Sequence, residues 1–106
     1  MSSKLTRSDA IFHIKELAQS LGAIANGTDW HLFGSVNRDE PNASDVDLMI
    51  LCRSDSQADT LRYSIDTDSL PLPLHLSLLT FGEASEINAI LVQQSCLVLK
   101  IASDEY

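Results

Sequence analysis

The chain has 106 residues, 44% of them hydrophobic, and a formal net charge of −8 at pH 7. This length predicts one domain over residues 1–106, with enough apolar side chains to build a core. The 15 acidic residues outnumber the 7 basic ones, which are scattered along the chain. An extended nucleic-acid-binding surface needs clustered Lys and Arg, so the composition argues against such a surface.

No apolar run approaches the length of a membrane span, and the first residues show no signal peptide. We therefore expect a cytoplasmic protein without a membrane partner. Cys52 and Cys96 both lie in apolar runs. We interpret them as reduced thiols of the core rather than as metal or redox groups.

The first half of the chain predicts a helix, a strand, a loop and a second strand. Their ranges are residues 8–25, 30–33, 34–44 and 46–52. Thr6 and Asp9 have the spacing of a capping box at the start of the helix, and Ser8 is a rival cap. Asn37 and Pro41 discourage regular structure in the loop.

The second half predicts a helix, a turn, a strand, a helix and a last strand. The helix is capped at Ser54 and reaches Ile65, and the others span residues 66–69, 72–80, 83–94 and 96–101. Pro71 and Pro73 confine the start of the strand to a sheet edge or to irregular backbone. This order predicts an α+β, sandwich-like fold, in which a small mixed β-sheet has helices packed mainly on one face.

The most informative motif joins the first two strands. Gly34 and Ser35 end the first strand, and Asp45 and Asp47 open the second after nine intervening residues (36–44). Because side chains alternate along a strand, the two acids point to the same face, about 6–7 Å apart. Paired carboxylates suit Mg²⁺ or Mn²⁺, and a Gly-Ser turn can present N–H groups and a hydroxyl group to phosphate. The motif therefore indicates chemistry on a nucleoside triphosphate.

This pattern resembles the polymerase-β-type nucleotidyltransferase superfamily, above all its minimal nucleotidyltransferase (MNT) branch. The shared signature is an apolar residue, Gly-Ser, a spacer of similar length, and Asp-x-Asp between apolar residues. The resemblance extends over residues 8–101 and implies the nucleotidyltransferase fold. It also implies a Mg²⁺-dependent enzyme that moves a nucleoside monophosphate from ATP, or another nucleoside triphosphate, to a hydroxyl acceptor.

By this resemblance, Asp45 and Asp47 are the catalytic metal ligands. Gly34 and Ser35 would hold the β- and γ-phosphate oxygens of the nucleotide. Arg38, in the loop between the motif halves, would also meet phosphate, although the neighbouring acids of the loop weaken its field.

One position departs from the family pattern. Active relatives carry a third acid on the next core strand, where this sequence has His75. A neutral imidazole is a poor ligand for Mg²⁺, but it can act as a general base near pH 7, and a plain structural role is the alternative. Asp66, Asp68 or Glu83 could also supply the missing acid.

Larger relatives have an additional helical domain that positions the acceptor. We therefore expect a homo-oligomer or a separate helical partner of the HEPN type, as in toxin–antitoxin pairs of the MNT branch. The alternative, favoured by His75, is a catalytically inactive module that binds a protein partner or a nucleotide. A plain acidic scaffold domain is the third hypothesis.

Overall fold

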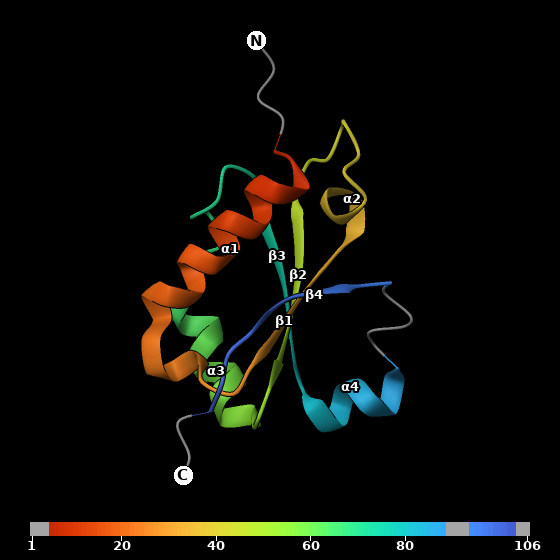
Figure 1. Cartoon of the computed structure of the whole chain (residues 1–106). Helices are drawn as coiled ribbons and strands as arrows, with labels where there is room; N and C mark the ends of the chain where they lie inside the picture. The colour runs from red at the N-terminus through yellow and green to blue at the C-terminus, as the bar shows by residue number, and fades with distance from the viewer. Residues whose placement is uncertain (1–4, 89–93, 104–106) are drawn as a thin grey trace.

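The computed structural model describes residues 5–88 and 94–103 (Figure 1). The elements in chain order are α1 (Arg7–Leu21), the 3₁₀ helix η1 (Gly22–Ala25), β1 (Asp29–Phe33), α2 (Gly34–Asn37), β2 (Val46–Cys52), α3 (Asp55–Ser64), β3 (Leu74–Thr80), α4 (Phe81–Ile87) and β4 (Cys96–Lys100). None of the helices within these two ranges has the length and apolar character needed to cross a membrane.

The four strands form one sheet in the order β3-β2-β1-β4. Strand β1 pairs antiparallel with both β2 and β4, whereas β2 and β3 run parallel and are joined through α3. The sheet is therefore mixed, and the predicted α+β nucleotidyltransferase-type arrangement is confirmed. The parallel pair matters for the site because it brings the N-terminal ends of β2 and β3 together.

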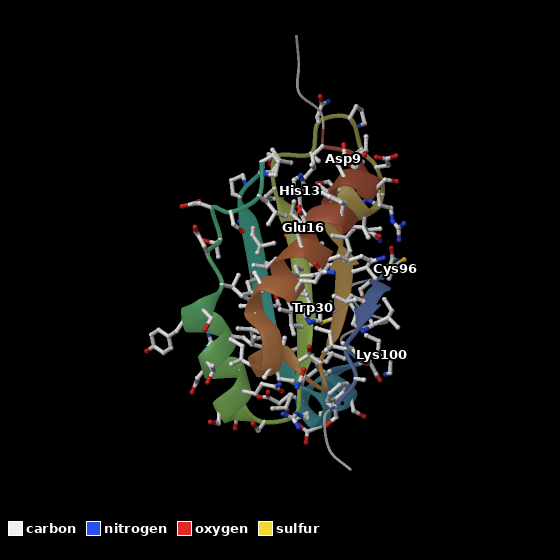
Figure 2. All side chains as sticks on the ribbon, turned by 60° about the vertical axis from the view of Figure 1, so that its left-hand side comes forward. Asp9, His13, Glu16, Trp30, Cys96 and Lys100 are labelled. Atoms are coloured by element: carbon white, nitrogen blue, oxygen red, sulfur yellow. The ribbon has the colours of Figure 1, made fainter. Side chains whose placement is uncertain are left out.

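The main hydrophobic core lies on the face of the sheet that α1 and α3 cover (Figure 1). Trp30 and Leu32 of β1 and the alternating apolar residues of β2 are buried there. Figure 2 shows Trp30 beside the ribbon of α1, and its Nε1 donates a hydrogen bond to Thr28 Oγ1 at 2.8 Å. These contacts fix which face of each strand points inward, and hence which face carries the polar residues.

Helix α4 covers one end of the opposite face of the sheet. Helix α4 packs its buried Ala84 against Met49 and Leu51, near the C-terminal end of β2. The N-terminal ends of β2 and β3 are separated from α4 by the length of the strands. At that end of the face, the side chain of His75 is mostly exposed to solvent.

Several predicted boundaries hold and others do not. Thr6 and Asp9 form the capping box of α1, so Ser8 is not the cap. Strand β3 begins at Leu74, after the two prolines of its approach. The predicted helix over residues 83–94 instead begins at Phe81, and the described helix ends at Ile87, before left-handed Asn88. Residues 89–93 of that prediction lie outside the described residues.

Two predictions were wrong. Residues 34–37, assigned to a loop, form the short helix α2, because Val36 is buried in the main core and holds this turn against it. Cys96, assigned to the core with Cys52, is exposed because β4 lies at the edge of the sheet (Figure 2). Cys52 is buried as predicted, and burial raises the pKa of its thiol to about 11.

Candidate active site

The candidate site lies where the parallel strands β2 and β3 begin, on the face opposite α1 and α3. In the register of this pair, Asp47 lies directly opposite His75. Val46 and Leu48 are buried in the main core, so strand alternation places Asp47 on the other face, together with Asp45. The two acids lie on one face because they alternate with Val46 and Leu48, which are buried on the other.

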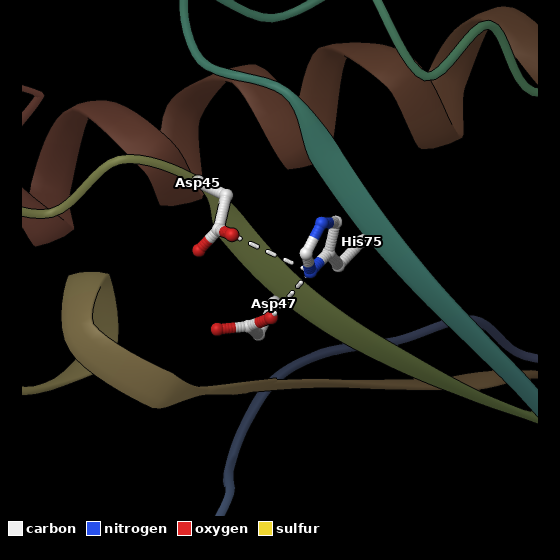
Figure 3. Close-up of side chains that lie close together, drawn as sticks. All are labelled: Asp45, Asp47 and His75. Carbon is white, nitrogen blue, oxygen red and sulfur yellow. Dashed lines mark ion pairs between the residues drawn. The ribbon is translucent and has the colours of Figure 1, made fainter.

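Asp45, Asp47 and His75 converge on one another (Figure 3). Nδ1 of His75 lies 3.4 Å from Oδ2 of Asp45 and 3.4 Å from Oδ1 of Asp47. One ligand atom from each residue lies within 4.8 Å of the others. The carboxylates are mostly covered, with 27% and 20% of their side chains exposed, whereas the imidazole is 66% exposed. A ligand from solvent therefore approaches from the side of His75.

The electrostatics of the cluster favour a cation. Burial and, second, the charge of Asp45 raise the pKa of the Asp47 carboxyl, while His75 and Arg38 oppose this rise. Two partly buried carboxylates side by side destabilise each other when both are ionised, and a divalent cation removes this repulsion. Two carboxylates and an imidazole are a chemically suitable donor set for such an ion, so the residues present fit a divalent metal.

Gly34 connects the two halves of the motif in space. Its φ of +76° lies in the left-handed region, which glycine adopts without strain. A Cβ placed on Gly34 would overlap Oδ2 of Asp47 and lie 2.8 Å from its Cγ. The backbone at Gly34 thus touches the carboxylate of the cluster, and only a residue without a side chain fits there.

Ser35 lies within α2, the short helix that follows Gly34, and Arg38 lies directly after it. Ser35 is half-buried in the short helix, and Arg38 follows at its C-terminal cap. Arg38 forms an ion pair with Glu40 through Nε, yet its charge still lowers the pKa of Asp47. Arg38 therefore acts electrostatically on the cluster even though an acid partly neutralises it.

A comparison with known protein families gives one match. The family described as a nucleotidyltransferase domain matches residues 14–101, which include all six predicted site residues. The chain belongs to this nucleotidyltransferase family. No curated protein matches the sequence. The resemblance to minimal nucleotidyltransferases of the polymerase-β type is thereby confirmed, together with the general reaction class of nucleotidyl transfer.

The other acids considered for the third position of this nucleotidyltransferase lie elsewhere. Asp66 and Asp68 form a turn before β3, in which the Asp68 N–H donates to Oδ1 of Asp66 at 2.9 Å. Glu83 caps α4 through the backbone N–H of Thr80, at the opposite end of β3 from the cluster. The structure therefore supports none of these acids as the third member of the site. His75 lies beside Asp45 and Asp47 instead.

The sequence reasoning missed the residues that tether α2 of the nucleotidyltransferase to α1. Nε of Arg7 donates to Oδ1 of Asn37 at 3.0 Å, and the Arg7 N–H donates to Oδ1 of Asp39 at 3.2 Å. These contacts hold the segment that carries Ser35 and Arg38 against the first helix. The partners are about thirty positions apart in the chain, so no local pattern indicates the contact.

Proposed function

We propose that this nucleotidyltransferase transfers a nucleoside monophosphate from ATP to a hydroxyl acceptor in a reaction that depends on Mg²⁺ or Mn²⁺. The observation that carries the proposal is the convergence of Asp45, Asp47 and His75 beside the Gly34 turn, in a chain of this family. The acceptor oxygen forms a bond to the α-phosphorus, and the bond from that phosphorus to the β-phosphate oxygen breaks. Pyrophosphate leaves.

Each residue of the site has a distinct task in this proposal. Asp45 and Asp47 hold the divalent cation, which when bound supplies charge neutralisation at the phosphates and makes the acceptor hydroxyl more acidic. The Gly34 backbone and the Ser35 N–H and hydroxyl groups bind the β- and γ-phosphate oxygens, and Arg38 adds positive charge. The hydroxyl proton passes to a basic group of the cluster, either the His75 imidazole or one of the carboxylates.

The acceptor site is proposed to come from a second protein surface. The resemblance to the MNT branch supports a helical partner of the HEPN type, as in a toxin–antitoxin pair, or a homo-oligomer. A hydroxyl group on that partner would then be the substrate. The net charge of −8 favours a partner with a complementary basic surface over a nucleic-acid acceptor.

A second candidate function is a catalytically inactive module that binds a protein partner or a nucleotide. The observation in its favour is His75, which occupies the position of an acid in active relatives. The intact pair of Asp45 and Asp47 favours the enzyme.

Incubation of the protein with α-labelled ATP, a divalent cation and a cell extract tests both candidates. The enzyme predicts label on a protein or small molecule, and its loss in the Asp47→Asn variant. An unlabelled extract together with a stable complex of protein and partner would support the inactive module. If ATP with Mg²⁺ or Mn²⁺ also fails to raise the melting temperature, only a scaffold role remains.

A further inference from the structure

The cluster differs from an all-carboxylate site in its third ligand. A nitrogen atom, Nδ1 of His75, faces both Asp45 and Asp47 at 3.4 Å. His75 projects from β3 directly opposite Asp47, so it occupies the place where a third carboxylate would approach the same cation. The identity of this ligand decides which metal ions the site prefers.

Mg²⁺ is bound by oxygen ligands in nearly ideal octahedral geometry, and it rarely accepts imidazole nitrogen. Zn²⁺ accepts nitrogen and carboxylate oxygen together, and Mn²⁺ follows it in affinity for mixed sites of this kind. An unprotonated imidazole therefore adds affinity for Zn²⁺ and Mn²⁺ and almost none for Mg²⁺.

The distances within the cluster agree with this preference. A tetrahedral ion with bonds of about 2.0–2.1 Å holds neighbouring ligand atoms roughly 3.3–3.4 Å apart. An octahedral Mg²⁺ ion with bonds of similar length holds its nearest ligands roughly 2.9 Å apart. The two separations from His75 Nδ1 are 3.4 Å each, which is the spacing of the first arrangement for two of its three ligand pairs, and the two aspartate oxygen atoms lie within 4.8 Å of each other.

We propose that His75 is a direct metal ligand and makes this site select Zn²⁺ over Mn²⁺ and Mn²⁺ over Mg²⁺. This deepens, and for its catalytic meaning rests on, the nucleotidyltransferase function proposed above. It assigns Nδ1 of His75 to the cation, so the proton of the acceptor hydroxyl goes to a carboxylate oxygen or to solvent. Mg²⁺ would then support the reaction poorly.

The experiment measures metal affinity directly and requires no turnover. Untagged protein in a Cys96→Ser background, which removes an exposed thiol as a competing zinc ligand, is titrated with each metal by calorimetry. The wild-type site should bind Zn²⁺ and Mn²⁺ more tightly than Mg²⁺. Co²⁺, used as a coloured substitute for Zn²⁺, should give the visible absorption of a site with a nitrogen ligand.

Two variants of His75 and one control separate the alternatives. His75→Ala should weaken Zn²⁺ binding at least about 100-fold, because loss of even an outer partner of a ligand costs about 10–100-fold. His75→Asp should narrow the preference for Zn²⁺, with Mg²⁺ binding roughly tenfold tighter than in the wild type. His13→Ala is the matched control, because His13 also faces an acid, Glu16 at 3.8 Å, but lies on α1. It should leave all affinities unchanged.

The proposal is overturned if the wild type binds Mg²⁺ as tightly as Zn²⁺, or if His75→Ala keeps the wild-type Zn²⁺ affinity. In that case His75 only forms ion pairs with the two aspartates. His75 is mostly exposed, so its variants should fold, and circular dichroism checks this. Failure of the nucleotidyltransferase function would give a different result. The protein would show the metal selectivity proposed here, but none of its metal-bound forms would transfer label from ATP.

Discussion

Replacement of Gly34 by alanine is expected to disable the site while the fold survives. The φ of +76° at this position costs an alanine about 1–2 kcal/mol of stability. The new Cβ would also lie 2.8 Å from Cγ of Asp47, whereas carbon atoms in contact prefer about 3.5–4.0 Å. The Asp47 carboxylate must therefore move by roughly 1 Å, and a displacement of this size in a catalytic group costs about 100-fold in rate.

Gly22 provides a matched control for the backbone strain. Its φ is +62°, and a Cβ built there meets nothing within 4 Å. With its ψ of −135°, this backbone conformation also disfavours residues with a side chain, so Gly22→Ala should lose stability through backbone strain and keep normal metal binding. Gly82→Ala is a second control, because its Cβ would meet only Thr80 Oγ1, at 3.9 Å.

Urea denaturation, metal calorimetry and transfer of label from α-labelled ATP are measured on all three variants. Gly34→Ala alone should lose both metal affinity and label transfer. The reasoning is refuted if Gly34→Ala binds metal like the wild type. It is equally refuted if Gly22→Ala impairs the site as much as Gly34→Ala does, since strain without overlap would then suffice.

Three further predictions concern titration and reactivity. Because the pKa of Asp47 is raised in the folded state, its ionised form destabilises the metal-free protein at neutral pH, and this effect fades as the pH falls towards 3.8. Metal-free Asp47→Asn should therefore unfold at a higher urea concentration than the wild type at pH 7. Equal urea midpoints would contradict this. Burial lowers the pKa of His31, so stability should fall as the pH drops through 6.5, and His31→Gln should reduce this loss in acid unfolding curves. In a thiol-reagent titration, exposed Cys96 should react quickly and Cys52, with a pKa of about 11, only after unfolding; two fast thiols would disprove the assignment.

The sequence predicted the parts of the fold that depend on local patterns. Periodicity predicts the apolar run of β2 and the acids that alternate with it. Short-range hydrogen bonding predicts the capping box of Thr6 and Asp9. The match of residues 14–101 to the nucleotidyltransferase family supports the predicted fold. For the site, the pattern could bring Asp45 and Asp47 to one face because they share a strand.

What the sequence could not predict depends on the pairing of distant segments. His75 is placed in the site through the family resemblance and not through a local pattern, because its position beside Asp47 requires the parallel register of β2 and β3. The exposure of Cys96 depends on β4 being an edge strand, and an apolar run looks the same at an edge as in the centre. Helix α2 depends on burial of Val36, a tertiary contact.

The direct pairing of Asp47 with His75 ties ion binding to the alignment of the sheet. A slip of one residue between β2 and β3 would turn His75 to the opposite face, among the apolar side chains beneath α1. A bound ion would cross-link the two strands, and it could do so only when the strands are correctly aligned. Loading would then raise the free energy of every slipped or frayed arrangement relative to the native one, in proportion to the logarithm of the ion concentration.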